Sequence, residues 1–335
     1  MPNITLKTLA KRTGLSVTTV SRALKDGPEI NINTKKRVVE AANVLNYQPN
    51  LYAYRLKMGK TFQICFFLNQ LDDISNYEKQ IIKGIFKSLN NSNYELIVKP
   101  IFRSNQIDAI KEVVEKKLAD GIIISHTTLN DERVKFLLEK NFPFVTHGRT
   151  ELFSEHPYFD NDHADFINKS LTYLERKKCE EIIFIKPANK FTYNYISVKA
   201  FEKKIKELKL KSSQNLEFTH EDTLQELKNK IIKKFSKKTN LKGIICGSDV
   251  RSLVVNSTLQ KLGYTINENV FVISKSFSKA PDYFFPKIPY FHEDMELTGC
   301  KLGDFLLKRI SGSNISELQH VEKNKFIENN ETSNS

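Results

Sequence analysis

The chain has 335 residues, of which 27% are charged and 40% are hydrophobic. That length is enough for a small module beside a core domain of usual size, or for two linked α/β lobes, and one compact domain is not expected. No run approaches the roughly 18 apolar residues of a membrane span, and the first residues, MPNITLKTLAK, lack the apolar stretch of a secretory signal. We therefore expect a cytoplasmic protein with no membrane partner.

The positive charge is concentrated at the N-terminus. Of the formal net charge of +13, residues 1–60 carry +8, from eleven Lys and Arg against three acids, which leaves +5 for the other 275 residues. A cationic module on a nearly balanced body is the pattern expected of a protein that docks on phosphates. The four cysteines form no CxxC pair, so we expect neither disulfides nor zinc, and three of them lie in apolar runs as buried thiols would.

The first predicted elements are two short helices joined by a tight turn. Apolar side chains recur at helical spacing over residues 6–10, Gly14 interrupts the period, and residues 17–24 resume it. Thr5 and Ser16 precede the two helices, and each hydroxyl can accept a backbone N–H that a helix start leaves unpaired. These features predict a helix-turn-helix.

A third helix is predicted to start at an Asn31 cap and to end before Pro49, so that three helices share one small core. Residues 50–60 favour a helix but are fewer than the about 12 to 15 residues that an isolated helix needs in water. We interpret them as a hinge whose helix is conditional on its surroundings. The predicted apolar face of the third helix comprises Val38, Val39, Ala42 and Leu45.

Beyond residue 60, β-rich runs alternate with amphipathic helices, and the pattern occurs twice. Such alternation predicts parallel sheets with covering helices, here as two similar lobes with a cleft between them. The expected strands are 63–68, 94–99, 121–125, 142–147, 181–186, 243–247 and 270–275. The expected domains are a DNA-binding domain at 1–49, a hinge helix at 50–60, and a core at 61–320, with lobe 1 at about 61–160 plus 291–320, lobe 2 at about 161–290, and a polar tail at 321–335.

The second predicted helix carries residues suited to the major groove of DNA. In the predicted register Val20 faces the core, and Thr18, Ser21 and Arg22 point outward. An arginine can donate two hydrogen bonds to guanine, and hydroxyls can bind base edges or phosphates. The Val17 side chain can contact a thymine methyl. An ordinary helical hairpin with a polar face is the alternative interpretation.

The segments LSVTTVSRAL at 15–24, LNYQPN at 45–50 and AYRLK at 53–57 resemble, at this spacing, the LacI family of bacterial transcriptional regulators. The resemblance covers nearly the whole chain. It implies a small all-α helix-turn-helix head, a hinge helix and a two-lobed, doubly wound α/β core of periplasmic-binding-protein type. It also implies a sequence-specific DNA-binding repressor, not an enzyme, that is controlled allosterically by a small effector such as a sugar or sugar derivative. Because one short recognition helix covers few base pairs, we expect a homodimer on a pseudo-palindromic operator.

The resemblance assigns DNA contacts residue by residue. Leu56 falls on a hinge leucine that is wedged into the minor groove, with Ala53 on the same helix face, and an apolar wedge stabilises a bent duplex. The alternative is that Leu56 packs the hinge against the core. The implied base-contacting residues are Leu6, Val17, Thr18, Ser21 and Arg22, and the implied phosphate-contacting residues are Thr5, Ser16, Thr19, Thr34, Tyr47 and Asn50.

The core departs from the family pattern at several sugar-binding positions. The Arg that often precedes a Gly-aromatic pair is missing from residues 197–201, Ser248-Asp249 replaces an Asn-Asp pair, and Ser276 replaces an acid. Several polar residues still lie at or beyond the C-terminal ends of predicted strands, where α/β clefts bind ligands. Each could instead be a helix cap or a surface ion pair. The candidate effector-binding residues are Asp73 (or its neighbour Asp72), Arg149, Asp162, Tyr193, Asp249 and Ser276.

The segment HPYFDNDH at 156–163 packs two histidines and two aspartates into eight residues, which raises the possibility of a transition-metal site. Its spacing excludes an EF-hand loop. We favour the interpretation that Asp162 or a neighbour starts a helix, where an acid meets the positive end of the dipole. No GxxxxGK[ST], GxGxxG, HExxH or GxSxG motif occurs, so we expect no enzymatic activity, cofactor or metal. The competing hypotheses are an exported solute-binding protein and an α/β enzyme.

Overall fold

The computed structural model describes residues 4–48, 51–69, 77–101, 106–186, 190–212, 222–236 and 241–328. The chain divides into two compact units, Met1–Thr61 and Phe62–Ser335. Within the described residues, no helix combines the length and the apolar character needed to cross a membrane.

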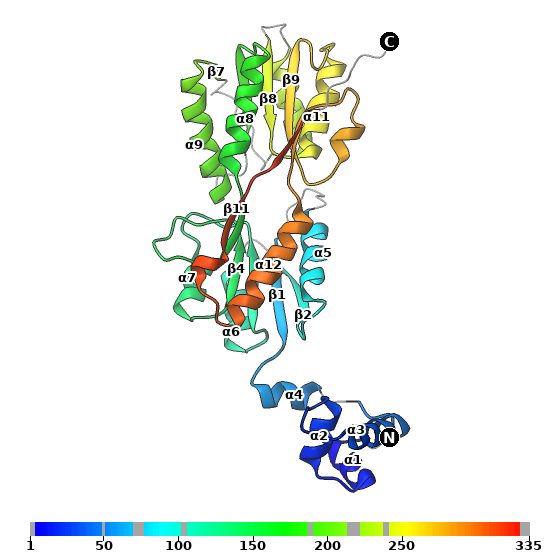
Figure 1. Ribbon diagram of the computed structural model, residues 1–335. Helices are drawn as coiled ribbons and strands as arrows, with labels where there is room; N and C mark the ends of the chain where they lie inside the picture. The colour runs from blue at the N-terminus through cyan, green and yellow to red at the C-terminus, as the bar shows by residue number, and fades with distance from the viewer. Residues whose placement is uncertain are drawn as a thin grey trace. The chain divides into compact units, whose positions relative to one another are not determined.

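The first unit is helical (Figure 1). Its core consists of six buried side chains shared by the first three helices, as the periodicity predicts. The three predicted caps are confirmed, because Thr5, Ser16 and Asn31 each accept a backbone N–H at the start of a helix. Val39 was expected on the core face of the third helix but is 45% exposed. The buried face runs through Val38 and Ala42, and Val39 lies beside it. The helices are α1 (Leu6–Thr13), α2 (Val17–Leu24), α3 (Ile32–Val44) and α4 (Leu51–Met58).

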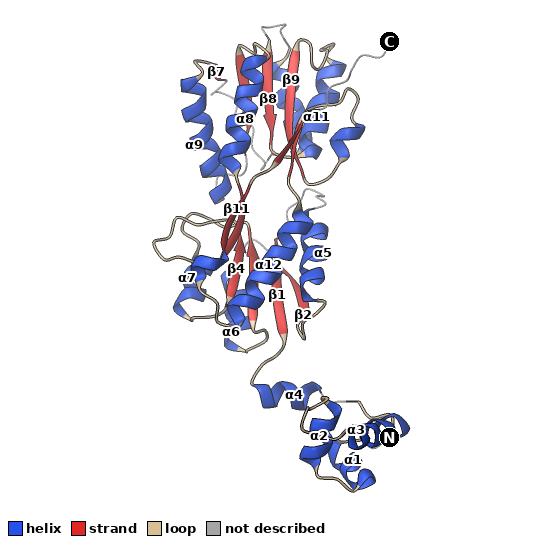
Figure 2. Ribbon diagram, in the orientation of Figure 1, coloured by secondary structure: helices blue, strands red, loops and turns tan. Residues whose placement is uncertain are grey.

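The second unit contains two six-stranded sheets, each flanked by helices, and this confirms the predicted two-lobed α/β core (Figure 2). All strand pairs are parallel except β10 with β12. The strand order is β11-β5-β4-β3-β1-β2 in the first lobe and β12-β10-β9-β8-β6-β7 in the second. The strands of the first lobe are β1 (Gln63–Asn69), β2 (Glu95–Ile101), β3 (Gly121–Ser125), β4 (Phe144–His147), β5 (Tyr158–Asn161) and β11 (Gln319–Glu322). Those of the second are β6 (Glu181–Ile185), β7 (Lys211–Ser212), β8 (Lys242–Cys246), β9 (Val270–Ser276), β10 (Tyr290–His292) and β12 (Lys325–Ile327).

Helices cover both faces of each sheet, so the inner strands are buried, and the strands and helices form four apolar clusters. Three of the cysteines lie in these clusters, as their apolar neighbours in the sequence predict. The helices of the first lobe are α5 (Tyr77–Leu89), α6 (Gln106–Glu115), α7 (Glu132–Glu139) and α12 (Met295–Ile310). Those of the second lobe are α8 (His163–Arg176), α9 (Thr192–Glu207), α10 (Leu224–Lys234) and α11 (Asp249–Lys261).

The chain passes between the lobes three times, from β5 to α8, from β10 to α12 and from β11 to β12. The expectation that the core ends at residue 320 and that 321–335 form a polar tail is wrong for the first part of that range. Phe326 in β12 packs against Phe291 and Tyr173, with ring centroids 4.7 Å and 5.9 Å away. An apolar pair of residues among polar neighbours is enough to anchor this edge strand, because β10 offers it a partner.

Helices α5 and α12 pack closely because glycines face one another. A Cβ atom on Gly299 would lie 2.1 Å from the Ile81 carbonyl oxygen, so no larger residue fits without a shift of backbone. At Gly303 the nearest obstacle is instead the Ser88 hydroxyl, which can rotate. The two helices therefore form one tight unit on a face of the first sheet.

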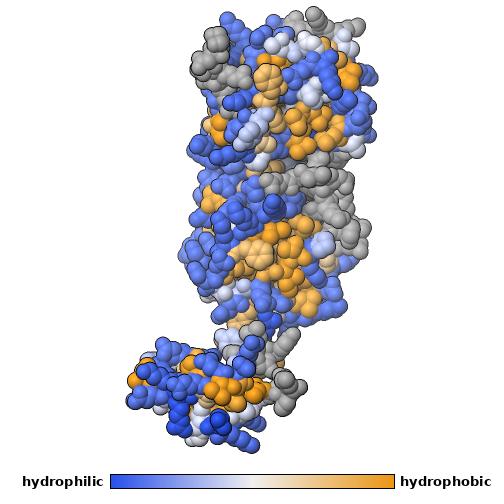
Figure 3. All heavy atoms as spheres, turned by 90° about the vertical axis from the view of Figure 1, so that its right-hand side faces the viewer, coloured by the Kyte–Doolittle hydropathy of each residue, from blue (hydrophilic) through white to orange (hydrophobic). Residues whose placement is uncertain are grey.

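Apolar side chains are exposed on both lobes on the side of the molecule that carries α5 and α11 (Figure 3). Phe86 of α5 is 51% exposed and Leu297 of α12 is 39% exposed. Leu253 of α11 is 49% exposed, and Phe285, which follows the 3₁₀ turn Ala280–Tyr283, is 85% exposed. We call these four residues the apolar side.

Candidate functional site

Helix α2 separates a buried face from a polar one. Val20 and Ala23 are buried in the core of the head, whereas Thr18 and Arg22 are exposed and Ser21 is half-buried. The side chains that the sequence predicts as DNA-contacting therefore occupy the face of α2 that no neighbouring helix covers. Val17, at the start of the helix, is 40% exposed.

The remaining predicted DNA-contacting residues lie at the ends of helices. The Ser16 hydroxyl accepts the Thr19 N–H at 3.0 Å and lies 2.8 Å from the Thr19 hydroxyl. Thr5 caps α1, where Leu6 is half-buried against the head core.

The other predicted DNA-contacting residues belong to α3, the turn after it and α4. Thr34 is half-buried in the first turn of α3, and Tyr47, which follows that helix, is half-buried with its pKa raised by burial. On α4, Ala53 is exposed and Leu56 is 85% exposed, while Asn50 lies outside the described residues.

One contact on the head was not predicted from the sequence. Arg22 Nε lies 3.5 Å from Glu29 Oε1, in the turn between α2 and α3. Both side chains remain accessible, at 60% and 47% exposure. The arginine of the predicted recognition helix is therefore paired with an acid through Nε and remains largely exposed.

The two lobes of the core meet through a set of aromatic and histidine rings. Tyr77 contacts His126, His147 and Phe277, with centroid separations of 5.3, 5.7 and 5.4 Å. His126 also contacts Phe191, at 5.4 Å. Tyr77, His126 and His147 belong to the first lobe. Phe191 and Phe277 belong to the second, so these rings bridge the lobes. We call Tyr77, His126, His147, Phe191, Tyr193 and Phe277 the ring cluster.

Burial sets the protonation of the ring cluster. It lowers the pKa of His147 to about 4 and that of His126 to about 3, so both rings are neutral near pH 7. The Tyr77 hydroxyl lies 2.6 Å from His147 Nδ1, and burial raises the pKa of Tyr77. His126 has a left-handed backbone, with φ 56°, and Arg133 Nη2 donates to its carbonyl at 3.0 Å. A strained residue held by a buried arginine is a feature typical of binding sites.

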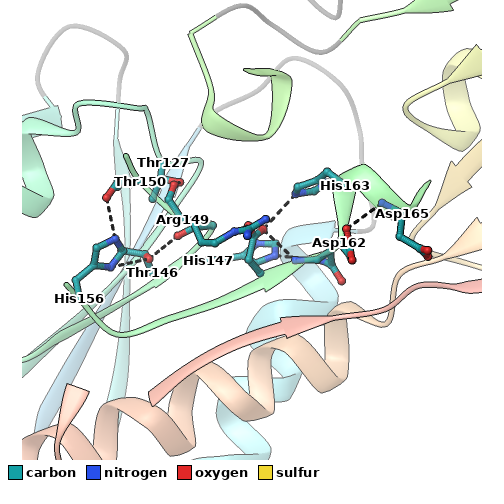
Figure 4. A network of polar contacts seen from close by, with 12 residues as sticks. Thr127, Thr146, His147, Arg149, Thr150, His156, Asp162, His163 and Asp165 are labelled. Atoms are coloured by element: carbon teal, nitrogen blue, oxygen red, sulfur yellow. Dashed lines mark hydrogen bonds and ion pairs between the residues drawn. The ribbon is translucent and has the colours of Figure 1, made fainter. Parts of the chain in front are cut away.

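A second connection between the lobes consists of buried charges. Asp160 accepts from Arg149 Nε at 2.8 Å and lies 3.1 Å from His163 Nε2 (Figure 4 labels Arg149 and His163). Lys275 Nζ lies 2.8 Å from His163 Nδ1 and 2.7 Å from Glu293 Oε1. We call Arg149, Asp160, His163, Lys275, Glu293 and Asn324 the relay, since Asn324 Nδ2 donates to Glu293 at 2.9 Å and completes it.

The relay involves all three chain crossings. Asp160 and His163 flank the first crossing, Glu293 lies in the second and Asn324 in the third. The neighbouring cations lower the pKa of Asp160 and of Glu293 against the opposing effect of burial, so both are carboxylates near pH 7. Its other members come from the end of β9 and from the residues after β4. A single set of contacts therefore joins the segments that must bend if the lobes move.

The structure brings most of the predicted effector residues to the region between the lobes. Tyr193 belongs to the ring cluster and lies 5.6 Å from His163, which connects it to Arg149 through Asp160. In the second lobe, Asp249 Oδ2 accepts from the Ser276 hydroxyl at 2.8 Å. Asp73 lies outside the described residues.

Asp162 caps α8, because its Oδ1 accepts the Asp165 N–H at 2.9 Å, and this confirms that an acid starts the helix (Figure 4). The histidines of the same segment have other partners. His156 Nε2 lies 3.0 Å from the Thr150 hydroxyl, and His163 belongs to the relay. Over the part of the chain that the structure describes, no group of three or more His, Cys, Asp or Glu side chains is placed to hold a metal.

Two protein-family models match the chain. Residues 5–50 match the model for bacterial regulatory proteins of the lacI family, and residues 171–328 match that of a periplasmic binding protein-like domain. The chain belongs to the LacI family. This LacI-family chain is therefore a DNA-binding transcriptional regulator and not an enzyme.

Relatives and solved structures agree with this assignment. The chain is 29% identical to the transcriptional regulator MalR of Streptococcus pneumoniae serotype 4, over 70% of this chain and 72% of the relative. It is 25% identical to the regulator RegA of Clostridium saccharobutylicum over 98% of both chains. The fold is that of the lac repressor dimer bound to operator and the anti-inducer ONPF, with a TM-score of 0.79, 15% identity and coverage of 97% of this chain and 98% of that one. A CelR–cellobiose complex gives a TM-score of 0.72 at 17% identity, with the same coverage.

Proposed function

We propose that this protein is a cytoplasmic repressor that binds a pseudo-palindromic operator as a homodimer and changes its affinity when a sugar or sugar derivative binds between the lobes. The observation that carries the proposal is the exposed polar face of α2, with Thr18 and Arg22 directed away from the head core, on a chain whose core has two lobes joined by a ring cluster. We assign DNA binding to residues 1–49, a hinge to 50–60, and effector binding and dimerisation to the core that begins at residue 61 and includes β12.

The ring cluster and the polar groups beside it support a carbohydrate effector. Small-molecule sites combine apolar and aromatic walls with a few polar groups that fix orientation. The rings supply the walls, and Arg149, Asp249 and Ser276 supply donors and acceptors nearby. The CelR structure with a similar fold was solved with cellobiose. The absence of the family's usual arginine and of the acid at position 276 supports either a sugar of unusual structure or weak binding.

The apolar side supports the homodimer. Exposed contiguous apolar surface on a soluble protein is typical of an interaction site, and here it occurs on both lobes. A two-fold partner that covers both areas would fix the spacing between two heads. The similar lac repressor structure is a dimer on its operator.

The DNA-binding part of the proposal is tested by selecting sequences from a random DNA library with the full chain. The expected result is an enriched site with two-fold symmetry, bound by a dimer in sedimentation experiments. Enrichment of asymmetric sites by a monomer would contradict the homodimer, and no enrichment would contradict sequence-specific binding.

The effector is tested by a thermal-shift screen of monosaccharides and disaccharides, followed by calorimetry on the best ligand. A ligand at about 100 times its dissociation constant adds roughly 2.7 kcal/mol of stability. Arg149→Ala and Asp162→Ala are expected to weaken binding, whereas Arg176→Ala, on the exposed end of α8, serves as the matched control. Unchanged binding by both variants would contradict the cleft assignment.

A further inference from the structure

The contact between Arg22 and Glu29 depends on a turn that folds back over the end of α2. Gly27 N–H donates to the Arg22 carbonyl at 2.9 Å, and the Ile30 N–H donates to the Gly27 carbonyl at 3.1 Å. Lys35 of α3 fastens the same turn, with its Nζ 2.6 Å from Asp26 Oδ1. The backbone around Glu29 is therefore fixed by contacts to both α2 and α3.

Gly27 leaves room for the Glu29 side chain to reach α2. A Cβ atom at residue 27 would lie 2.9 Å from Glu29 Oε2 and 3.2 Å from the Arg22 carbonyl oxygen. The carboxylate therefore lies over the glycine and reaches Arg22 Nε, at 3.5 Å. The Arg22 atom closest to the acid is Nε, which leaves the two terminal nitrogens of the guanidinium for contacts with a base.

This placement has opposite consequences for the two kinds of DNA contact. A guanine accepts two hydrogen bonds from a guanidinium, and an oriented guanidinium loses less freedom on making them. Binding to phosphates, by contrast, depends on net positive charge, which an adjacent carboxylate reduces. An acid at this position therefore weakens sequence-independent binding while it orients the group that reads a base.

We propose that Glu29 is a positioning residue that raises the specificity of this regulator, by orienting Arg22 toward guanine and by opposing contacts with phosphates at other sequences. The inference rests on the proposed role of Arg22 in base reading. Specificity is a difference between two affinities, so a residue that lowers the weaker one contributes to it as much as one that raises the stronger.

The test uses Glu29→Gln in the full chain, with Glu40→Gln as the control that removes the same charge from an exposed position on α3. Each protein is measured on its best selected site, on that site with the guanine replaced, and on unrelated DNA, over a series of salt concentrations. Because exposed ion pairs contribute about 0.2 to 1 kcal/mol, we expect Glu29→Gln to reduce the preference for guanine by a factor of about 1.4 to 5. We also expect tighter binding to unrelated DNA with a steeper salt dependence than for Glu40→Gln.

The same measurements on Arg22→Ala and on the double variant separate this inference from the proposed base reading. If Arg22→Ala keeps the wild-type base preference, Arg22 does not read a base and the proposed register of α2 is wrong. If Arg22→Ala loses the preference but Glu29→Gln matches Glu40→Gln in every readout, the role of Glu29 is refuted. The inference is supported if Glu29→Gln changes base preference only when Arg22 is present. Gly27→Ala, which displaces the carboxylate without removing its charge, is expected to reproduce the loss of base preference.

Discussion

Lowering the pH from about 7.5 to about 5.5 is expected to destabilise the core, because desolvation keeps the half-buried rings of His126 and His147 neutral. In the unfolded chain an imidazole has a pKa of about 6.5. Burial lowers the pKa to about 3 for His126 and to about 4 for His147. Between the unfolded and folded values the unfolded state binds more protons, so the free energy of unfolding falls as the pH falls through this window.

The size of the effect follows from linkage. At a pH about one unit below 6.5, each histidine that stays neutral in the folded protein lowers the free energy of unfolding by about 1.4 kcal/mol. Near pH 7.5 it lowers that free energy by less than about 0.1 kcal/mol. The free energy of unfolding should therefore fall by about 2 to 3 kcal/mol over this range. Burial also lowers the pKa of His156, which adds to the loss in the same direction. The lowered pKa values of Asp160 and Glu293 stabilise the fold above the unfolded values near 4 and do not contribute to this window.

The assay is urea unfolding of the full chain, followed by circular dichroism at constant ionic strength. His147→Gln should remove about half of the pH-dependent loss, since one of the two rings no longer titrates. His320→Gln, at a position 48% exposed on β11, controls for loss of an imidazole elsewhere. If wild type loses less than about 0.5 kcal/mol, or if His147→Gln retains the whole loss, burial does not hold these rings neutral and the reasoning fails.

Three further predictions concern the hinge, the helix pair and the relay. Leu56→Ala should weaken operator binding by at least about 1 kcal/mol and reduce DNA bending, because an exposed apolar wedge is lost. If the wild-type protein leaves its operator unbent, the wedge is refuted. Gly299→Ala should cost about 1 to 3 kcal/mol in thermal unfolding, since its Cβ meets backbone, and Gly303→Ala should cost less, since its Cβ meets a hydroxyl; equal costs would contradict this packing. Lys275→Met should lower the free energy of unfolding in urea by about 3 to 5 kcal/mol, because it removes the cation paired with Glu293. The double variant Lys275→Met, Glu293→Leu should recover most of that loss. An equally unstable double variant would contradict the role of this buried ion pair.

The apolar strands of the core could be predicted from the sequence, and the polar ones could not. Strands β1, β3, β4, β6, β8 and β9 are largely buried, and β2, at a sheet edge, is half-buried along Leu96–Val98, so all seven appear as apolar runs. Strands such as β5 (YFDN) and β11 (QHVE) have four residues, half of them or more polar, and no run to reveal them. They form because a neighbouring strand pairs with them, and that information lies far away in the sequence.

Only part of the candidate site was predicted, because some of its contacts join residues that are far apart in the sequence. Arg149 was found because it follows a strand, but His147, the last residue of that strand, and His126, directly after β3, satisfied the same rule and were missed. Lys275 offered a different signal, since a charged residue inside the buried strand VFVISKS must have a partner. Its partner Glu293 could not be identified from spacing, because the two meet only where β9 lies beside the second chain crossing.

Breaking the contacts of the ring cluster takes less free energy than breaking those of the relay. This difference decides where the two lobes can separate. A ring pair contributes about 0.5 to 1.5 kcal/mol beyond the area that it buries, whereas a buried ion pair that loses one partner costs about 3 to 5 kcal/mol. The relay also joins all three crossings, so opening there would leave Asp160 or Glu293 buried and uncompensated. We therefore expect the lobes to pivot about the relay and to separate at the ring cluster. Separation would return His126 and His147 to water, so the acid sensitivity of the fold and the opening of the effector site should involve the same two rings.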